Sequence, residues 1–213
     1  MRVFRPGGLE LTKKAVDMLG LKPGDKVLDI GCGLGASLKF LAESYGADVR
    51  GVDFAPEAVR KTAELIGEGR ALCADACRLP FEDESFQLVL MECVLTLIPE
   101  PELALSEALR VLAPEGALVI SGLCGAGPGA VCSGGRLNTA GLTQYLEAQG
   151  MEIALLSDET AALRRFVAEV IFEYDSIEQY TAHADRELGG SVLSCNVPVK
   201  GTGYVLVAAK KKK

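Results

Sequence analysis

The stretch VLDIGCGLG, at residues 27–35, decides the fold. Residues 26–30 predict a strand, and three glycines at alternate positions follow it at once. Glycine adopts backbone angles that other residues avoid, and it leaves space for a ligand to approach the main chain. The glycines lead into a predicted helix at residues 37–45. The stretch therefore predicts a strand, a sharp turn and a helix, in that order.

Strands and helices continue to alternate as far as residue 121. Further strands are predicted at 49–53, 70–74, 86–91 and 116–121, and further helices at 9–19, 56–66 and 102–112. The run at 86–91 is almost continuously apolar, as expected for a strand that is buried on both faces. This alternation predicts a doubly wound α/β fold, in which helices cover both faces of a mostly parallel sheet.

The pattern changes after residue 121. We expect a glycine-rich loop at 122–135, a strand at 151–156, a closing strand at 203–209, and helices at 139–149, 158–175 and 176–188. One domain is expected over residues 1–213, with an N-terminal helix or flap at 1–25 and a core at 26–122. The helical insertion at 159–199 is larger than a simple connection requires, so it is a candidate substrate cover.

Bulk properties narrow the possible partners and location. The net charge of −7 and the pI near 4.9 argue against a nucleic-acid partner, because phosphate binding needs clustered Lys and Arg. No apolar stretch approaches the roughly 20 residues that span a bilayer, and the N-terminus lacks a signal-peptide hydrophobic region. The chain has an odd count of seven cysteines, several of them in or beside predicted buried strands, which fits reduced thiols. We therefore expect a cytoplasmic protein without membrane segments.

Three carboxylates bear on what the glycine turn binds. The turn alone is weak support, because its spacing also satisfies a dinucleotide-binding pattern. Asp29 lies just before the glycines, where it suits a positively charged amino acid group and is poorly matched to a pyrophosphate. Asp53 ends the next strand and suits ribose hydroxyls, a feature shared by both cofactor types. Asp75 ends the third strand, where it suits an adenine amino group or, equally, a helix N-cap or loop carboxylate.

With these residues in view, the sequence resembles the class I S-adenosylmethionine-dependent methyltransferases, especially their small-molecule methyltransferase-type domains. The resemblance spans residues 20–122 in one continuous order. It rests on four segments, at residues 27–35, 51–53, 74–81 with 85–86, and 107–116. It implies a seven-stranded sheet whose last strand is antiparallel, with residues 203–209 as the candidate.

The resemblance also implies roles for individual residues. The cofactor's methionine part is expected beside the turn, its ribose at Asp53, its adenine near Phe54, and its reactive methyl beside Glu92 and Cys93. The full set of expected cofactor-binding residues is Asp29, Gly31, Cys32, Gly33, Gly35, Asp53, Phe54, Asp75, Ala76, Glu92 and Cys93. Two positions depart from the family pattern: Gln87 replaces a common Asp, and Thr96 with Leu97 replaces one or two histidines. No catalytic base is therefore assigned.

Methyl transfer from a sulfonium is an in-line displacement that positioning alone can accelerate, so a base is not obligatory. His183, the only histidine, is interpreted as structural. Aromatic residues of the insertion could line a pocket, although helical spacing favours a core role. These residues are Phe166, Phe172, Tyr174 and Tyr180.

Several interpretations stay open. The expected acceptor is a small molecule that the sequence does not identify. The same turn also fits an NAD(P)-dependent oxidoreductase or a non-catalytic S-adenosylmethionine-binding protein. Thiols near the carboxyl strand ends could hold a thiophilic metalloid acceptor, but buried hydrophobic cysteines are the favoured reading, and no metal site is predicted. The thiols in question are Cys32, Cys93, Cys124, Cys132 and Cys195.

Overall fold

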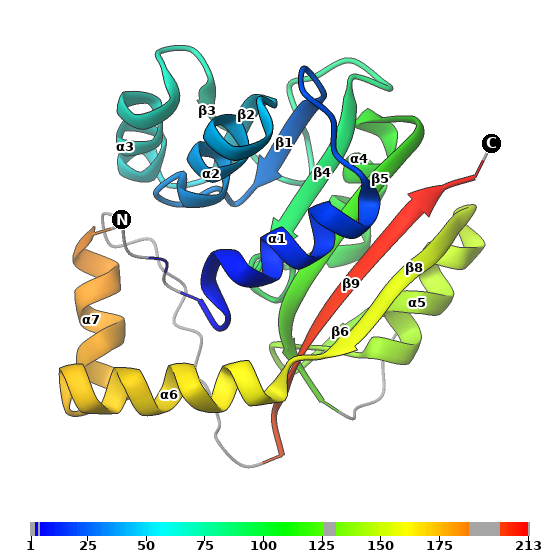
Figure 1. The fold of residues 1–213 in the computed structure, drawn as a ribbon. Coiled ribbons are helices and arrows are strands. Elements are labelled where there is room, and N and C mark those ends of the chain that lie inside the picture. Colours follow the sequence, from blue (N-terminus) through cyan, green and yellow to red (C-terminus); the bar gives the residue numbers. More distant parts are fainter. Residues whose placement is uncertain (1–2, 4, 126–130, 188–200, 213) are drawn as a thin grey trace.

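A mixed sheet forms the centre of the computed structural model, which describes residues 3, 5–125, 131–187 and 201–212 (Figure 1). Its seven principal strands lie side by side in the order β3-β2-β1-β4-β5-β9-β8. All neighbours from β3 to β5 pair in parallel, and β9 is antiparallel to both β5 and β8. The strands are β1 (Lys26–Ile30), β2 (Asp48–Asp53), β3 (Ala71–Cys73), β4 (Phe86–Glu92), β5 (Leu112–Cys124), β8 (Met151–Asp158) and β9 (Gly203–Lys211).

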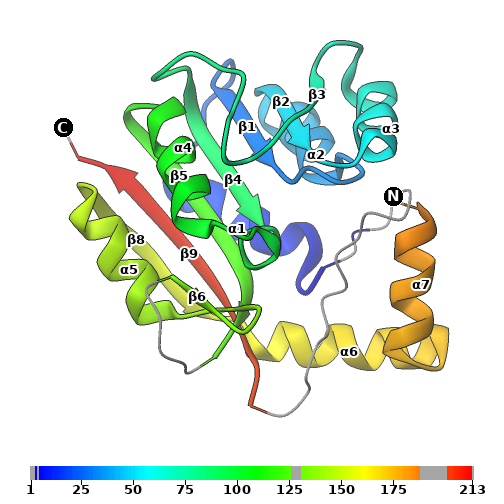
Figure 2. The same ribbon diagram turned by 180° about the vertical axis from the view of Figure 1, so that it is seen from behind.

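Helices cover both faces of the sheet (Figures 1 and 2). One face carries α1 (Gly8–Leu19) and α2 (Ala36–Tyr45), and α3 (Pro56–Ile66) packs on α2 and the outer strands. The opposite face carries α4 (Pro101–Val111) and α5 (Thr139–Ala148). Each face has its own apolar cluster, and strands β4, β5 and β9 contribute side chains to both. This confirms the doubly wound α/β fold and its late antiparallel strand.

Most predicted elements match the observed ones to within two residues, and β1 and α3 match at both ends. The expected loop at 122–135 was wrong in part. Strand β5 continues to Cys124, because its last residues still pair with β9, and two short strands follow at β6 (Cys132–Ser133) and β7 (Arg136–Leu137). Asp158 ends β8 instead of starting a helix, since it pairs with Val205. Cross-strand pairing of this kind is invisible in local sequence.

Two helices extend beyond the carboxyl ends of the parallel strands (Figure 1). They are α6 (Thr160–Tyr174) and α7 (Ile177–Glu187), which pack against each other, and α6 also contacts β9. A short helical turn, η1 (Leu95–Leu97), follows β4 at the same end of the sheet. Carboxyl strand ends are where open α/β sheets bind ligands, so α6, α7 and η1 lie where they can enclose one. The rest of the expected insertion, residues 188–199, lies outside the described residues.

Candidate active site

The glycine turn between β1 and α2 has backbone angles that would be strained for any other residue. Gly31 and Gly33 have φ values of 74° and 52°, in the left-handed region. A Cβ on Gly31 would lie 2.4 Å from Cγ2 of Val94, so no side chain fits there. The main-chain N–H of Gly31 donates to the carbonyl of Val52 (2.8 Å), which fixes the turn to β2. The sequence therefore places a bare, immobilised main-chain loop at the carboxyl end of β1.

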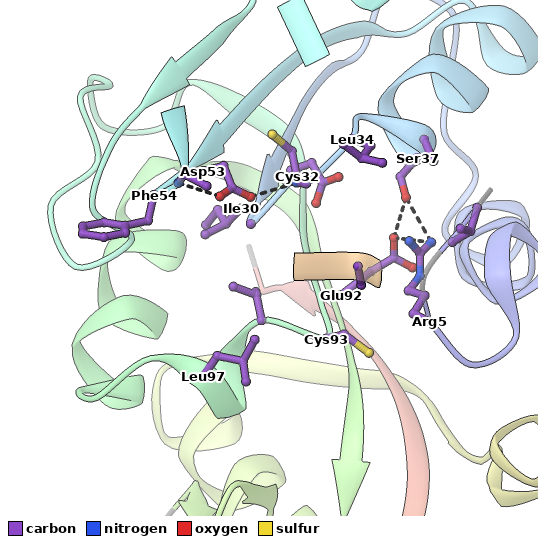
Figure 3. Close-up of a pocket in the computed structure, with 18 of the residues that line it drawn as sticks. Arg5, Ile30, Cys32, Leu34, Ser37, Asp53, Phe54, Glu92, Cys93 and Leu97 are labelled. Atoms are coloured by element: carbon purple, nitrogen blue, oxygen red, sulfur yellow. Dashed lines mark hydrogen bonds and ion pairs between the residues drawn. The ribbon is translucent and has the colours of Figure 1, made fainter. Parts of the chain in front are cut away.

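Asp53 connects this turn to the end of β2. Its Oδ2 accepts from the main-chain N–H of Gly33 (2.8 Å), and its Oδ1 accepts from the N–H of Ala55 (2.9 Å), as drawn in Figure 3. Both bonds are charge-assisted and therefore stronger than neutral ones. The carboxylate thus holds the turn and the start of α3 in a fixed relation.

The end of β3 has features of both interpretations offered for Asp75. Its Oδ1 accepts from the N–H of Cys77 (2.8 Å), which is a local turn contact, yet Asp75 and Ala76 also line the cavity. Phe54 lies at the neighbouring edge of the same cavity (Figure 3), and 80% of its surface is exposed. A phenyl ring left this open at a cavity edge offers a face on which a flat ligand can stack.

Glu92, at the end of β4, lies in a buried polar cluster (Figure 3). Its Oε2 forms an ion pair with Nη2 of Arg5 (2.9 Å), and only 2% of the Glu92 side chain is exposed. Thr12 donates to one carboxylate oxygen and Ser37 to the other, both at 2.8 Å. Arg5 in turn donates to both hydroxyls. The cluster joins the N-terminal segment, α1, α2 and β4.

Arg5 is the main functional residue that sequence reasoning missed. The sequence places it only in the N-terminal helix or flap at 1–25, and no local signal links it to Glu92, which lies 87 residues further along the chain. Its pKa is raised despite the cost of burial, because Glu92 and other acidic groups surround it. Arg5 is therefore a fixed cation at one end of the site.

One cavity of about 650 Å³ brings these groups together. It takes in all of the predicted cofactor-binding residues except Gly35, which starts α2 behind the turn and faces Thr62. Phe166 and Tyr180 also line the cavity, whereas Phe172 is 92% exposed. His183 packs against Tyr174 and is not part of the cavity wall. The expected cofactor-binding residues thus share one cavity wall, while their individual roles stay predictions.

Comparison with known proteins shows which family this arrangement is similar to. Residues 28–120 match the family model described as a methyltransferase domain, and this range contains the glycine turn, Asp53, Asp75 and Glu92. Over these residues, a little under half of the chain, the protein is similar to methyltransferases. No helix among the described residues is long and apolar enough to cross a membrane.

Individual methyltransferases resemble the chain over different lengths. Phosphoethanolamine N-methyltransferase 3 from Arabidopsis thaliana is 27% identical over 186 residues, which are 85% of this chain and 36% of that protein. A 2-methyl-6-phytyl-1,4-hydroquinone methyltransferase from Synechocystis is 36% identical over 104 residues, covering 47% of this chain and 33% of the relative. The chain thus spans about a third of the length of these relatives.

A solved structure shows that the methyltransferase fold also serves other chemistry. The crystal structure of SpnF, named as a cyclase, has a TM-score of 0.72 and is 25% identical. The alignment covers 95% of this chain and 81% of SpnF. Function must therefore be argued from the site and not from the fold alone.

The cysteine thiols do not converge on a metalloid site in the part of the chain that the structure describes. Cys32 and Cys93 line the cavity, but a Cβ on Gly51 would lie 2.8 Å from Sγ of Cys32, so that thiol packs over β2. Sγ of Cys93 lies 2.9 Å from Oη of Tyr204. Cys124 and Cys132 are not part of the cavity wall, and no group of three metal-binding side chains occurs among the described residues. Cys195 lies outside them.

Ionising the buried Asp29 carboxylate costs free energy in the ligand-free protein, and this cost indicates a positively charged ligand. Only 4% of the residue is exposed, and its pKa is raised well above the ordinary value by burial and by the negative charges of Glu92 and Asp53. The positive charge of Arg5 lowers the pKa of Asp29, but it does not cancel the increase. A bound cationic group would relieve the repulsion.

We expect Asp29→Asn to stabilise the ligand-free protein at pH 7.5 while weakening cofactor binding. The pKa of Asp29 is higher in the folded than in the unfolded chain, so its cost is absent below about pH 4 and grows as the pH rises toward the folded value. Thermal melts from pH 4 to 8 check this. The gain over wild type should vanish near pH 4.

Asp17→Asn is the control of opposite sign. A hydrogen bond from Lys13 lowers the pKa of the exposed Asp17 carboxyl, so its loss should leave the melting temperature at pH 7.5 unchanged or slightly lower. An Asp29→Asn protein that melts below wild type at pH 7.5 would contradict the assignment of Asp29 as a strained buried charge.

Proposed function

We propose that this cavity binds S-adenosylmethionine and that the protein transfers its methyl group to a small-molecule acceptor. The observation that carries the proposal is the convergence of Asp29 and Asp53 on one bare glycine turn, at the carboxyl ends of β1 and β2. Small-molecule acceptors, and not nucleic acids, agree with the net charge of −7. The six described cysteines form no disulfide with one another, which supports the cytoplasmic location expected from the sequence.

The charges of the site fit this cofactor better than a nicotinamide dinucleotide. Three carboxylates, those of Asp29, Asp53 and Glu92, lie around the turn, and the Arg5 cation is already paired with Glu92. A pyrophosphate would place two further negative charges there, which is unfavourable in a partly buried site. A ligand bearing an ammonium and a sulfonium is attracted instead. This supports the methyltransferase interpretation over the NAD(P)-dependent oxidoreductase.

Different residues would hold different parts of the cofactor. The glycine turn and Asp29 would hold the amino acid part, and Asp53 would hold the ribose. Phe54, Asp75 and Ala76 would surround the adenine. The bare Gly31 main chain and the exposed Phe54 ring are the structural features that fit these roles.

The main contribution of the protein to the reaction would be to position the acceptor against the methyl group. When bound, S-adenosylmethionine supplies an electrophilic methyl group on a sulfonium. Cys93 is placed near the end of β4 with a φ of 58°, a strained angle for a residue other than glycine. Its thiol contacts Tyr204, whose hydroxyl also lies 3.0 Å from that of Ser121. Among the described residues the cavity wall contains no histidine, so alignment of the acceptor is the contribution we assign to it.

Calorimetry followed by turnover tests the proposal. We expect S-adenosylmethionine to bind and NAD(P) not to bind. Incubation with pooled metabolites should then yield S-adenosylhomocysteine and a product heavier by one CH2 unit. Tight NAD(P) binding without S-adenosylmethionine binding would favour an oxidoreductase. Cofactor binding without turnover across a broad acceptor panel would favour a non-catalytic binding protein.

A further inference from the structure

The cavity has two halves of different chemistry. The half formed by the ends of β1, β2 and β4 contains its charged side chains, together with Arg5 and Asp75. The other half is formed by Val3 and Pro6 on either side of Arg5, the residues after β4, the end of β5, and helices α6 and α7. Its members are Val3, Pro6, Val94, Leu97, Ile98, Pro99, Leu123, Phe166, Val167, Val170, Ile177, Tyr180, Thr181 and Ala184.

None of the described residues in this second half is charged. Val170 and Ala184 are 2% and 3% exposed, so they form a closed aliphatic wall. The ring of Phe166 packs edge-on against Tyr180, with centroids 5.5 Å apart. The hydroxyl of Thr181 donates to the carbonyl of Ile177 within its own helix (2.8 Å). The wall therefore offers mainly apolar and aromatic surface.

Arg5 does not make this half suitable for an anion. It is the only cation among the described residues of the cavity wall, and its Nη2 contacts Glu92, Thr12 and Ser37, whereas its buried Nε has no hydrogen-bond partner. Because the Glu92 carboxylate already neutralises the charge of Arg5, a phosphate or carboxylate on an acceptor would lose water without meeting a net positive charge. An apolar acceptor would gain by leaving water.

We propose that the acceptor is an uncharged lipophilic molecule whose apolar body lies between η1 and helices α6 and α7, with its nucleophile directed toward the glycine turn. Leu97 marks the η1 side of this space in Figure 3, across from Ile30 and the turn. The inference rests on the proposed function, since the charged half must hold the cofactor. It assigns to α6 and α7 the selection of uncharged over charged acceptors.

Binding of the neutral fluorescent probe N-phenyl-1-naphthylamine, in the presence of S-adenosylhomocysteine, tests the acceptor class. Wild type should bind the probe saturably. Val170→Glu, which puts a charge into the wall, should weaken probe binding at least tenfold. Ile171→Glu is the matched control, because its neighbouring aliphatic side chain is 48% exposed and lies off the cavity wall, and it should bind like wild type.

A second variant protects the test against misfolding of Val170→Glu. Ala184→Phe adds no charge and fills the cavity from α7, so it should also lose probe binding. Calorimetry with S-adenosylhomocysteine should show cofactor binding unchanged in all three variants. In turnover assays at pH 9, where a phenol of pKa about 10 is partly ionised and its proton has gone to the buffer, alkyl phenols should be methylated to their methyl ethers and phosphoethanolamine should not.

The outcomes separate the two proposals. Failure of the wild-type protein to bind S-adenosylhomocysteine would overturn the proposed function itself. Cofactor binding with no saturable probe binding would overturn only the lipophilic acceptor, as would equal probe binding by wild type and both wall variants. Methylation of phosphoethanolamine in preference to alkyl phenols would also refute the lipophilic acceptor while leaving the methyltransferase assignment intact.

Discussion

Replacing Asp53 with alanine is expected to weaken S-adenosylmethionine binding about 100-fold. The change removes two charge-assisted hydrogen bonds, to the N–H groups of Gly33 and Ala55, each of a kind worth about 1.5 to 3 kcal/mol. The glycine turn then loses its link to the end of β2, and the carboxylate proposed to hold the ribose is gone. Calorimetric titration of the cofactor measures the loss, because it reports binding without requiring an acceptor.

Asp48→Ala provides the control on the same strand. Asp48 begins β2, at the far end from the site, and pairs with Arg70 (2.9 Å). Its removal should leave cofactor affinity within about twofold, since partly exposed ion pairs contribute about 1 kcal/mol or less to stability and nothing to a distant site. If Asp53→Ala bound the cofactor as tightly as Asp48→Ala, the ribose assignment would be wrong.

The second large effect is expected for Glu92→Gln, which should lower the free energy of unfolding by about 3 kcal/mol. Removing one partner of a buried ion pair typically costs about 3 to 5 kcal/mol, because the other charge stays buried and uncompensated. Arg5 lies in the N-terminal segment and can reach water more easily than a residue in a central strand, so we expect the lower end of this range. Urea unfolding monitored by circular dichroism gives the value.

Asp83→Asn is a matched carboxylate-to-amide change at an exposed ion pair. Asp83 pairs with Arg110 (2.7 Å), but 74% of its side chain is exposed. The expected loss of unfolding free energy is below about 1 kcal/mol. Equal losses for the two variants would show that the Arg5–Glu92 pair is no more important than a surface contact.

Periodicity and turn residues predicted the elements well where local signals are strong. The alternation of strands and helices, the glycine turn and the proline at the start of α3 each act within a few residues, so single-sequence reasoning located β1 and α3 at both ends. The extension of β5 into a glycine-rich stretch was missed, because pairing with β9 depends on residues about 80 positions away. A glycine-rich stretch that predicts a loop can still form a strand when a partner strand is available to pair with it.

The candidate site was predictable in its list of residues and not in their roles. Asp29, Asp53 and Asp75 each follow the same rule, that parallel strand ends meet at one edge, so their convergence followed from the sequence. Glu92 was expected beside the reactive methyl group, whereas the structure engages it with Arg5. Cys93 lines the cavity, but its thiol contacts Tyr204 from the last strand. Neither partner is near in sequence.

The sequence by itself determined the strand, glycine turn and helix at residues 26–45 and the acidic residues at the strand ends, because backbone freedom and strand-end charge are local properties. Only the tertiary structure decided what surrounds that turn. It brought Arg5 from the N-terminus onto Glu92 and separated the cysteines that sequence position had grouped together. It also closed the cavity with the uncharged faces of α6 and α7. Those contacts depend on packing between distant segments, which no local pattern encodes.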